Sequence, residues 1–254
     1  MKRLRIGSVP YLNAWPLIWP LLEGRSPDDA TLVLAEPRLL RNKLRSGAVD
    51  AALLSSVEYL ADPRRFSYAP GFGVCSRGPV DSVKLLLRRA PEEVKTLALD
   101  PHSLTANLLA RAILELKYKA HPRRVRYDGT PAGWRRSKAD AGVVIGDRAL
   151  SFPETRHLDL GTEWTRWTGL PFVYALWIHR RRHPGLRTLY RVLARAAGAG
   201  LRARRDIARR AARQMKLDPD ACLRYLTVNI RYRIGPPERR ALREFSKCLR
   251  RLKR

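Results

Sequence analysis

Three polar side chains, Ser8, Tyr11 and Asn13, lie within an otherwise apolar stretch near the start of the chain. The stretch Ile6–Leu17 has the pattern of a short strand that runs into a loop, and Pro16 is placed to open a helix. Backbone N–H groups remain free where a strand gives way to a helix, and here hydroxyl and amide groups stand beside them. The segment therefore predicts a site for a small anion.

Asn13 is the residue of this loop with two distinct possible roles. An amide in an apolar segment must find hydrogen-bond partners or cost about 1–3 kcal/mol. It can orient a hydroxyl group of a substrate, or it can brace its own loop through an Asx-turn. The spacing alone favours the brace, and both interpretations stay open at this point.

Three later strands also end in turns with polar or flexible residues. These residues are Ser55 and Ser56, Ser103 and Thr105, and the pair Gly146 and Asp147. Taken singly, the hydroxyl groups are most simply helix caps, and the last pair is an ordinary turn. If the turns converge on one cleft, they offer neutral donors that suit two carboxylates. His102 stands beside one of these turns, where a histidine is more often structural than a ligand contact.

Strands and helices alternate along most of the chain. Apolar runs rich in β-branched residues predict strands at Leu4–Val9, Thr31–Ala35, Ala51–Leu54, Thr96–Leu99, Val125–Tyr127, Gly142–Ile145 and Phe172–Ile178. Between them lie helical patterns such as Pro37–Ser46, which has a leading proline and is followed by glycine. This alternation predicts an α/β fold whose parallel sheets bind ligands at the carboxyl ends of their strands.

We expect two lobes and a helical tail. Residues 1–85 are predicted to form the first part of one lobe, residues 86–179 a second lobe, and residues 180–254 helices that return to the first lobe. Residues 70–91 carry glycine and proline at both ends and are the expected passage between the lobes. From His183 onward the pattern is wholly helical.

The charge of the chain is strongly positive and unevenly spread. The chain has 254 residues, of which 45% are hydrophobic, and a formal net charge of +28. Residues 180–254 hold 24 basic and 5 acidic residues, a net charge of +19. Such a surface attracts RNA, anionic membranes or anionic substrates through its electrostatic field. A solvated, arginine-rich helix surface is the simpler explanation, and a nucleic-acid-binding protein remains a competing class.

Several functional classes are disfavoured by what the sequence lacks. Cys75, Cys222 and Cys248 are odd in number and widely spaced, so neither a disulfide framework nor a zinc site is expected. The histidines lack metal-binding spacing, and no phosphate-binding glycine loop or nucleophile elbow occurs. Asn13 and three prolines interrupt the apolar start, and no run reaches the roughly 20 apolar residues of a membrane span. We expect a soluble, cytoplasmic protein.

Five motifs occur together along the chain. They are SVPYLNAWPL at Ser8–Leu17, VDAALLSSVEYL at Val49–Leu60, LDPHSLTANLL at Leu99–Leu109, VVIGDRAL at Val143–Leu150 and DLGTEWTRWTGLPFVYALW at Asp159–Trp177. In this order they resemble the chorismate dehydratase family of the futalosine route to menaquinone, within the periplasmic-binding-protein-like superfamily. The first and last motifs are the specific ones. The chain departs from the family at Ala106, where a further hydroxyl is common, and at Pro20 in the first predicted helix.

The resemblance implies a two-lobed type II fold with a central cleft and C-terminal helices. It implies that water is eliminated from chorismate, a small dianion, to give 3-[(1-carboxyvinyl)oxy]benzoate. Asn13 is then the catalytic residue, and the substrate is bound by Ser8, Tyr11, Ser55, Ser56, Ser103, Thr105, Gly146 and Asp147. The hydroxyl and amide groups among them are not ionised bases; these are the side chains of Ser8, Asn13, Ser55, Ser56, Ser103 and Thr105. The enolpyruvyl carboxylate of the substrate is therefore expected to take the proton.

The resemblance also sets the partners and the alternatives. It implies no cofactor, no metal, no specific nucleic acid and no membrane partner. The related 1,4-dihydroxy-6-naphthoate synthase shares the architecture and acts later in the same pathway. A non-catalytic protein that binds a small carboxylate is the other alternative, because this architecture usually captures ligands without altering them.

Overall fold

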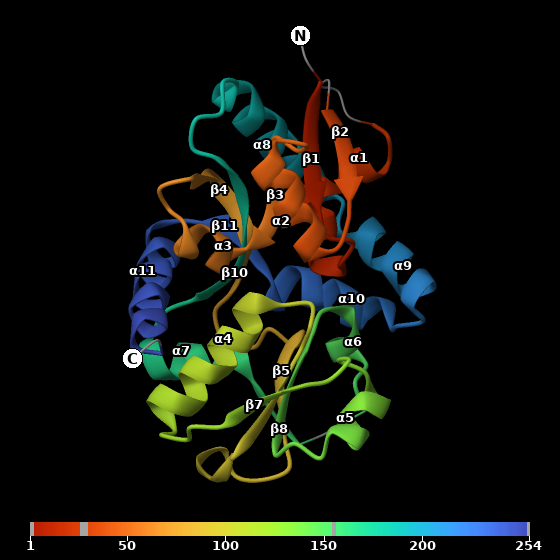
Figure 1. The fold of residues 1–254 in the computed structure, drawn as a ribbon. Helices are drawn as coiled ribbons and strands as arrows, with labels where there is room; N and C mark the ends of the chain where they lie inside the picture. The colour runs from red at the N-terminus through yellow and green to blue at the C-terminus, as the bar shows by residue number, and fades with distance from the viewer. Residues whose placement is uncertain (1–2, 26–29, 154–155, 253–254) are drawn as a thin grey trace. The chain divides into compact units, whose positions relative to one another are not determined.

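The computed structural model describes residues 3–25, 30–153 and 156–252, and it shows a mixed α/β chain (Figure 1). Strands and helices alternate along the chain as the sequence predicts. No helix in these described ranges combines the length and the apolar character that a bilayer crossing demands.

The chain divides into two compact units, and each unit has its own sheet. Unit 1 consists of residues 1–75 and 173–235, and unit 2 consists of residues 76–172 and 236–254. The prediction of a two-lobed α/β fold is thereby confirmed.

The sheet of unit 1 has six strands in the order β11-β4-β10-β3-β1-β2. The strands are β1 (Leu4–Ser8), β2 (Ala30–Leu34), β3 (Ala51–Ser55), β4 (Phe66–Ser76), β10 (Phe172–Arg180) and β11 (Arg231–Ile234). β1 pairs in parallel with β2 and β3, whereas β10 is antiparallel to β3. The carboxyl ends of β1, β2 and β3 therefore share one edge of the sheet.

The helices of unit 1 come from both ends of the sequence. They are the 3₁₀ turn Leu12–Ala14, α1 (Trp15–Leu22), α2 (Pro37–Ser46), α3 (Ser56–Ala61), α8 (Leu186–Arg202), α9 (Arg204–Met215), α10 (Pro219–Arg224) and the π-helical turn Tyr225–Asn229. α2 has the bounds predicted from its sequence and ends at Gly47, whose φ of 83° suits glycine. α8 packs closely on α1 at Gly200. The approach is so close that a Cβ at this position would overlap the carbonyl of Pro16.

The sheet of unit 2 has five strands in the order β7-β6-β8-β5-β9. The strands are β5 (Val83–Leu87), β6 (Thr96–Leu99), β7 (Arg123–Arg126), β8 (Ala141–Ile145) and β9 (His157–Asp159). β6 pairs in parallel with β7 and β8, and β5 is antiparallel to β8 and β9. Three neighbouring strands of unit 2 thus also end at one edge.

The helices of unit 2 include the last one in the chain. They are the 3₁₀ turn Pro91–Glu93, α4 (Leu104–Ala112), the π-helical turn Ile113–Lys117, α5 (Pro131–Ser137), α6 (Asp147–Leu150), α7 (Leu160–Thr168) and α11 (Pro236–Arg251). Phe245 of α11 meets Trp164 and Phe172 edge to face, with ring centroids 5.7 and 4.9 Å apart. These aromatic contacts hold α11 in the core of unit 2.

The unit boundaries differ from the expected residues 85 and 179. β5 pairs with β8 and β9, so the expected passage over residues 70–91 includes a central strand of the second sheet. α11 packs in unit 2 instead of returning to the first lobe, because its apolar face meets Trp164. The tail also contains β11, so residues after His183 are not wholly helical.

Candidate functional site

The carboxyl edge of the unit 1 sheet carries the first set of predicted site residues. Ser8 ends β1 and Ser55 ends β3, on two neighbouring parallel strands. Leu34 ends β2 and pairs in register with Ser8. Ser55 is half-buried. The shared edge brings these residues to the place where α/β sheets usually bind ligands.

Asn13 lies in the 3₁₀ turn that follows β1. The turn closes when the Ala14 N–H donates to the carbonyl of Tyr11 at 2.9 Å, and Tyr11 is half-buried just before it. The Asn13 side chain is half-buried and makes no hydrogen bond to any residue in the described part of the chain. The Asx-turn favoured from the spacing is therefore wrong. The amide instead offers two donors and an acceptor to a ligand.

Two of the predicted hydroxyl groups already donate their protons within unit 1. The buried Ser8 Oγ donates to the carbonyl of Val9 at 3.1 Å. The buried Ser56 Oγ donates to the carbonyl of Val173 at 2.8 Å. The lone pairs of these hydroxyl oxygens can still accept hydrogen bonds from a ligand, but their protons are already donated to main-chain carbonyls of the protein.

The carboxyl edge of the unit 2 sheet carries the second set. Ser103 caps α4, because its Oγ accepts the Ala106 N–H at 3.1 Å. Thr105 follows in the first turn and is buried. Asn107 fixes the start of this loop, since its side chain bonds the main-chain N–H and carbonyl of Asp100 at 3.0 and 2.8 Å. The cap interpretation is thus confirmed for Ser103.

Gly146 and Asp147 follow β8 at the same edge. Gly146 has a φ of 70° and a ψ of −153°, a conformation that essentially only glycine adopts. Its N–H donates to the carbonyl of Ser82 at 2.9 Å, so it is not the free donor that the turn had suggested. Asp147 opens α6 and is half-buried.

The structure adds a residue that the sequence interpretation missed, Asp100. Its carboxylate is fully buried at the end of β6, where it accepts the His102 N–H at 2.8 Å and pairs with Arg148 at 3.3 Å. Burial raises the pKa of Asp100, and the His102 N–H and the Arg148 guanidinium oppose that rise. The available signal was an acidic residue directly after the apolar strand TLAL, since a buried charge needs a partner.

Exposed apolar side chains accompany both sets of polar groups. Among the described residues, the large apolar side chains that are exposed are Leu34, Leu39, Leu104 and Val228. Leu34 ends β2 and Leu104 opens α4, so each lies beside predicted site residues of its own unit. Apolar surface next to polar donors suits a ring that carries carboxylates.

A second polar cluster of unit 1 lies at the opposite edge of its sheet. Asp50 directly precedes β3, accepts the Arg5 N–H at 2.7 Å and pairs with His183 at 3.4 Å. Burial opposes ionisation there, but the hydrogen bonds from Arg5 leave the pKa of Asp50 below its usual value. This cluster joins the strand starts and does not belong to the candidate site.

The sequence matches known proteins over nearly its whole length. A profile of a menaquinone-biosynthesis family matches residues 4–251. The chorismate dehydratase of Thermus thermophilus is 33% identical over 270 residues, which covers 98% of this chain and 96% of that protein.

Two solved structures have a similar fold. A crystal structure of an Archaeoglobus fulgidus protein matches with a TM-score of 0.78 at 17% identity, covering 99% of this chain and 98% of the other. The periplasmic aliphatic sulphonate binding protein of Escherichia coli matches with a TM-score of 0.66 at 16% identity, covering 100% and 88%. Likeness at this identity establishes the fold alone, and the predicted periplasmic-binding-protein-like fold is confirmed.

Proposed function

The chain belongs to the menaquinone-biosynthesis family, and on that premise we propose that it eliminates water from chorismate to give 3-[(1-carboxyvinyl)oxy]benzoate. This makes it a carbon–oxygen lyase of the hydro-lyase class, acting in the cytoplasm on the futalosine route. The single observation that carries the proposal is the 33% identity to a chorismate dehydratase over 98% of the chain.

The reaction itself explains why the candidate site needs little acid–base chemistry. The ring gains aromaticity when water leaves, and this supplies much of the driving force. Substrate and products balance without an oxidant or a reductant, so no redox cofactor is needed. The enolpyruvyl carboxylate of the substrate can remove the ring proton, and well-oriented intramolecular groups lower such barriers by up to roughly 7–11 kcal/mol. The protein then has to orient the substrate and assist the departing hydroxyl.

Asn13 is the proposed catalytic residue. Its amide is half-buried and has no hydrogen-bond partner among the described residues, so its donors are available to the leaving hydroxyl. A donor aimed at an oxygen that gains negative charge in the transition state is worth about a hundredfold to a thousandfold in rate.

The remaining predicted residues are proposed to bind the substrate. They are Ser8, Tyr11, Ser55 and Ser56 in unit 1, and Ser103, Thr105, Gly146 and Asp147 in unit 2. Ser56 and Gly146 act by shaping the backbone, because their own protons are already donated to Val173 and Ser82. The exposed Leu34 and Leu104 supply the apolar contact with the ring.

A non-catalytic carboxylate-binding protein is the second candidate. The likeness to the sulphonate binding protein favours it, since that fold captures anions without chemistry. The two functions are separated by incubating the purified protein with chorismate and following the products by mass spectrometry. Enzymatic elimination gives a product that has lost one water and has an aromatic spectrum, at a rate proportional to protein concentration. Binding of chorismate without that product would overturn the proposed reaction.

A further inference from the structure

Arg148 of unit 2 reaches over the carboxyl ends of three neighbouring parallel strands. It follows β8, and its Nη2 contacts the Asp100 carboxylate after β6 at 3.3 Å. Its Nη1 donates to the carbonyl of Asp128 after β7 at 3.2 Å. The strands lie in the order β7-β6-β8, so the guanidinium lies on the edge where α/β sheets bind ligands. We propose that Arg148 binds the ring carboxylate of the substrate, an inference that rests on the proposed function.

Asp100 holds the guanidinium in place. The Asp100 side chain is 0% exposed, whereas the Arg148 side chain is 36% exposed. The same carboxylate accepts the N–H of His102, so one buried group ties the loop after β6 to the side chain that follows β8. Asp100 is therefore a positioning residue that fixes the inner side of the guanidinium and leaves the outer side to solvent.

Gly129 makes room for this arrangement. It has a φ of 75°, and a Cβ built on it would lie 2.7 Å from the Arg148 Nη1. Any other residue there would be strained and would push the guanidinium from its position. The loop after β7 thus accommodates the arginine both through the Asp128 carbonyl and through the absence of a side chain at Gly129.

The guanidinium keeps donors for a ligand. Of its five N–H groups, the contacts with Asp100 and Asp128 occupy at most three, so at least two have no partner in the described part of the chain. The N-terminus of α4 lies next to it, because His102 and Arg148 contact the same carboxylate. A planar fork of donors beside a helix N-terminus matches a carboxylate.

The chemistry of the substrate decides which carboxylate Arg148 binds. The enolpyruvyl carboxylate must remain basic to accept the proton, and a guanidinium on it would reduce that basicity. The C–H bond breaks at the ring carbon that bears the enolpyruvyl ether, and its electron pair delocalises through the adjacent ring double bond onto the ring carboxylate. The pair then forms the new ring double bond as hydroxide leaves the next carbon, and the proton that the enolpyruvyl carboxylate accepted converts this hydroxide to water. A cation on the ring carboxylate therefore stabilises the charge that develops.

The alternative role of Arg148 is only to neutralise the buried Asp100. A double-mutant cycle separates the roles, because Asp100→Asn removes the buried charge and keeps an acceptor for the His102 N–H. In the Asp100→Asn protein, Arg148→Met should lower kcat/KM for chorismate about tenfold to a hundredfold further, the usual worth of a charged hydrogen bond. Arg148→Lys should fall between, since it keeps the charge and loses the fork.

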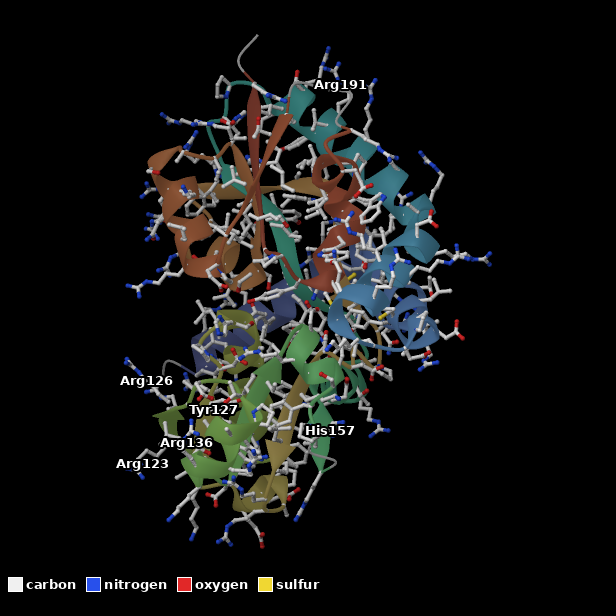
Figure 2. All side chains as sticks on the ribbon, turned by 90° about the vertical axis from the view of Figure 1, so that its right-hand side faces the viewer. Arg123, Arg126, Tyr127, Arg136, His157 and Arg191 are labelled. Carbon is white, nitrogen blue, oxygen red and sulfur yellow. The ribbon has the colours of Figure 1, made fainter. Side chains whose placement is uncertain are left out.

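Two ligand fragments identify the carboxylate that is bound. 3-Ethoxybenzoate keeps the ring carboxylate, and 2-phenoxyacrylate keeps the enolpyruvyl carboxylate. Calorimetry should show that Arg148→Met lowers the affinity for the product and for 3-ethoxybenzoate by the same factor. The affinity for 2-phenoxyacrylate should not change. The control variant is Arg123→Met, at the start of β7 and therefore at the opposite edge of the sheet. Arg123 is exposed and is labelled in Figure 2, and this variant should bind every ligand as the wild type does.

The outcomes separate this inference from the proposed function. If Asp100→Asn and the double variant have equal kcat/KM and equal affinity for the product, Arg148 only neutralises Asp100 and the inference is overturned. A loss of affinity for 2-phenoxyacrylate alone also overturns it. Wild-type protein that binds the product but does not turn over chorismate contradicts the proposed function, while the affinities still decide the role of Arg148.

Discussion

The hydroxyl of Ser56 donates a 2.8 Å hydrogen bond to the main-chain carbonyl of Val173, which lies 117 residues later in the chain. The bond ties the start of α3 to β10 inside unit 1, and the Ser56 side chain is fully buried. Ser56→Ala leaves that carbonyl one donor short, so we expect the free energy of unfolding to fall by about 1–2 kcal/mol. Urea denaturation followed by circular dichroism measures the change.

Ser46→Ala is the control for this variant. Ser46 is exposed, and its hydroxyl donates to the carbonyl of Lys43 at 3.1 Å and accepts the Ala48 N–H at 3.4 Å, both at the solvent-exposed end of the same helix. Its loss should change the free energy of unfolding by less than about 0.5 kcal/mol. Equal destabilisation by the two variants would contradict the structural role of Ser56.

The contact between α8 and α1 gives a second prediction. A Cβ at Gly200 would overlap the carbonyl of Pro16, whereas a Cβ at Gly198 would meet only Arg202 Nη1 at 3.7 Å. Gly200→Ala should therefore destabilise the protein by about 1–3 kcal/mol through overpacking. Gly198→Ala, two residues earlier in the same helix, should be neutral or stabilise by up to about 1 kcal/mol. Thermal unfolding of both variants is the measurement, and a lower melting temperature for Gly198→Ala than for Gly200→Ala would refute the packing.

Glu163 gives a prediction with a defined pH dependence. Its buried carboxylate accepts hydrogen bonds from Lys117 Nζ and from the Tyr118 hydroxyl, both at 2.6 Å. Burial raises the pKa of Glu163, but these two bonds outweigh burial and leave the pKa below its usual value of 4.5. The ionised form of Glu163 therefore stabilises the folded protein fully when the pH is above 4.5. This stabilisation is lost as the pH falls through the lowered pKa of the folded state.

Glu163→Gln should accordingly lower the free energy of unfolding by about 2 kcal/mol at pH 7. The difference from the wild type should shrink on acidification, and urea denaturation at a series of pH values follows it. Glu244→Gln is the control, because Glu244 forms a more exposed pair with Lys247, and it should cost less than about 1 kcal/mol at any pH. A difference for Glu163→Gln that stays constant down to pH 3 would contradict the assignment.

Leu104 tests the apolar part of the proposed site. It is 45% exposed at the start of α4, directly after the cap residue Ser103. Leu104→Ser should raise KM for chorismate about threefold to tenfold, because an apolar contact with the ring is lost. Val228 is more exposed, at 68%, but lies in the π-helical turn after α10, so Val228→Ser should leave KM unchanged. A similar change in KM for both variants would show that general surface polarity, and not a ring contact, is responsible.

The strand ends that carry the candidate site could be predicted from the sequence. Ser8, Ser55 and Gly146 each stand where an apolar run stops at a polar or flexible residue, and such a pattern is local. The pairing of β5 was not predicted, because VKLLL between glycine and proline segments is equally typical of a linker. The unit on which α11 packs could not be predicted from the sequence either. An apolar stripe shows that a helix buries one face, but it does not show against which hydrophobic core that face packs.

The polar partners within the site depend on contacts that are remote in the sequence. Arg148 meets Asp100 from 48 residues away, and the donor to the Val173 carbonyl is 117 residues from it. No local pattern carries this information. Asn13 is the opposite case, because a local pattern predicted a contact that the structure lacks. Its spacing fits an Asx-turn, but in the folded loop its amide has no partner among the described residues.

The most direct test of the account compares kcat for chorismate between the wild type and Asn13→Ala at saturating substrate. Asn13 makes no hydrogen bond within the described part of the protein, so the variant should keep the circular dichroism spectrum and the melting temperature of the wild type. We expect kcat to fall about a hundredfold or more, with 3-[(1-carboxyvinyl)oxy]benzoate as the wild-type product. A correctly folded Asn13→Ala protein with the kcat of the wild type would contradict it.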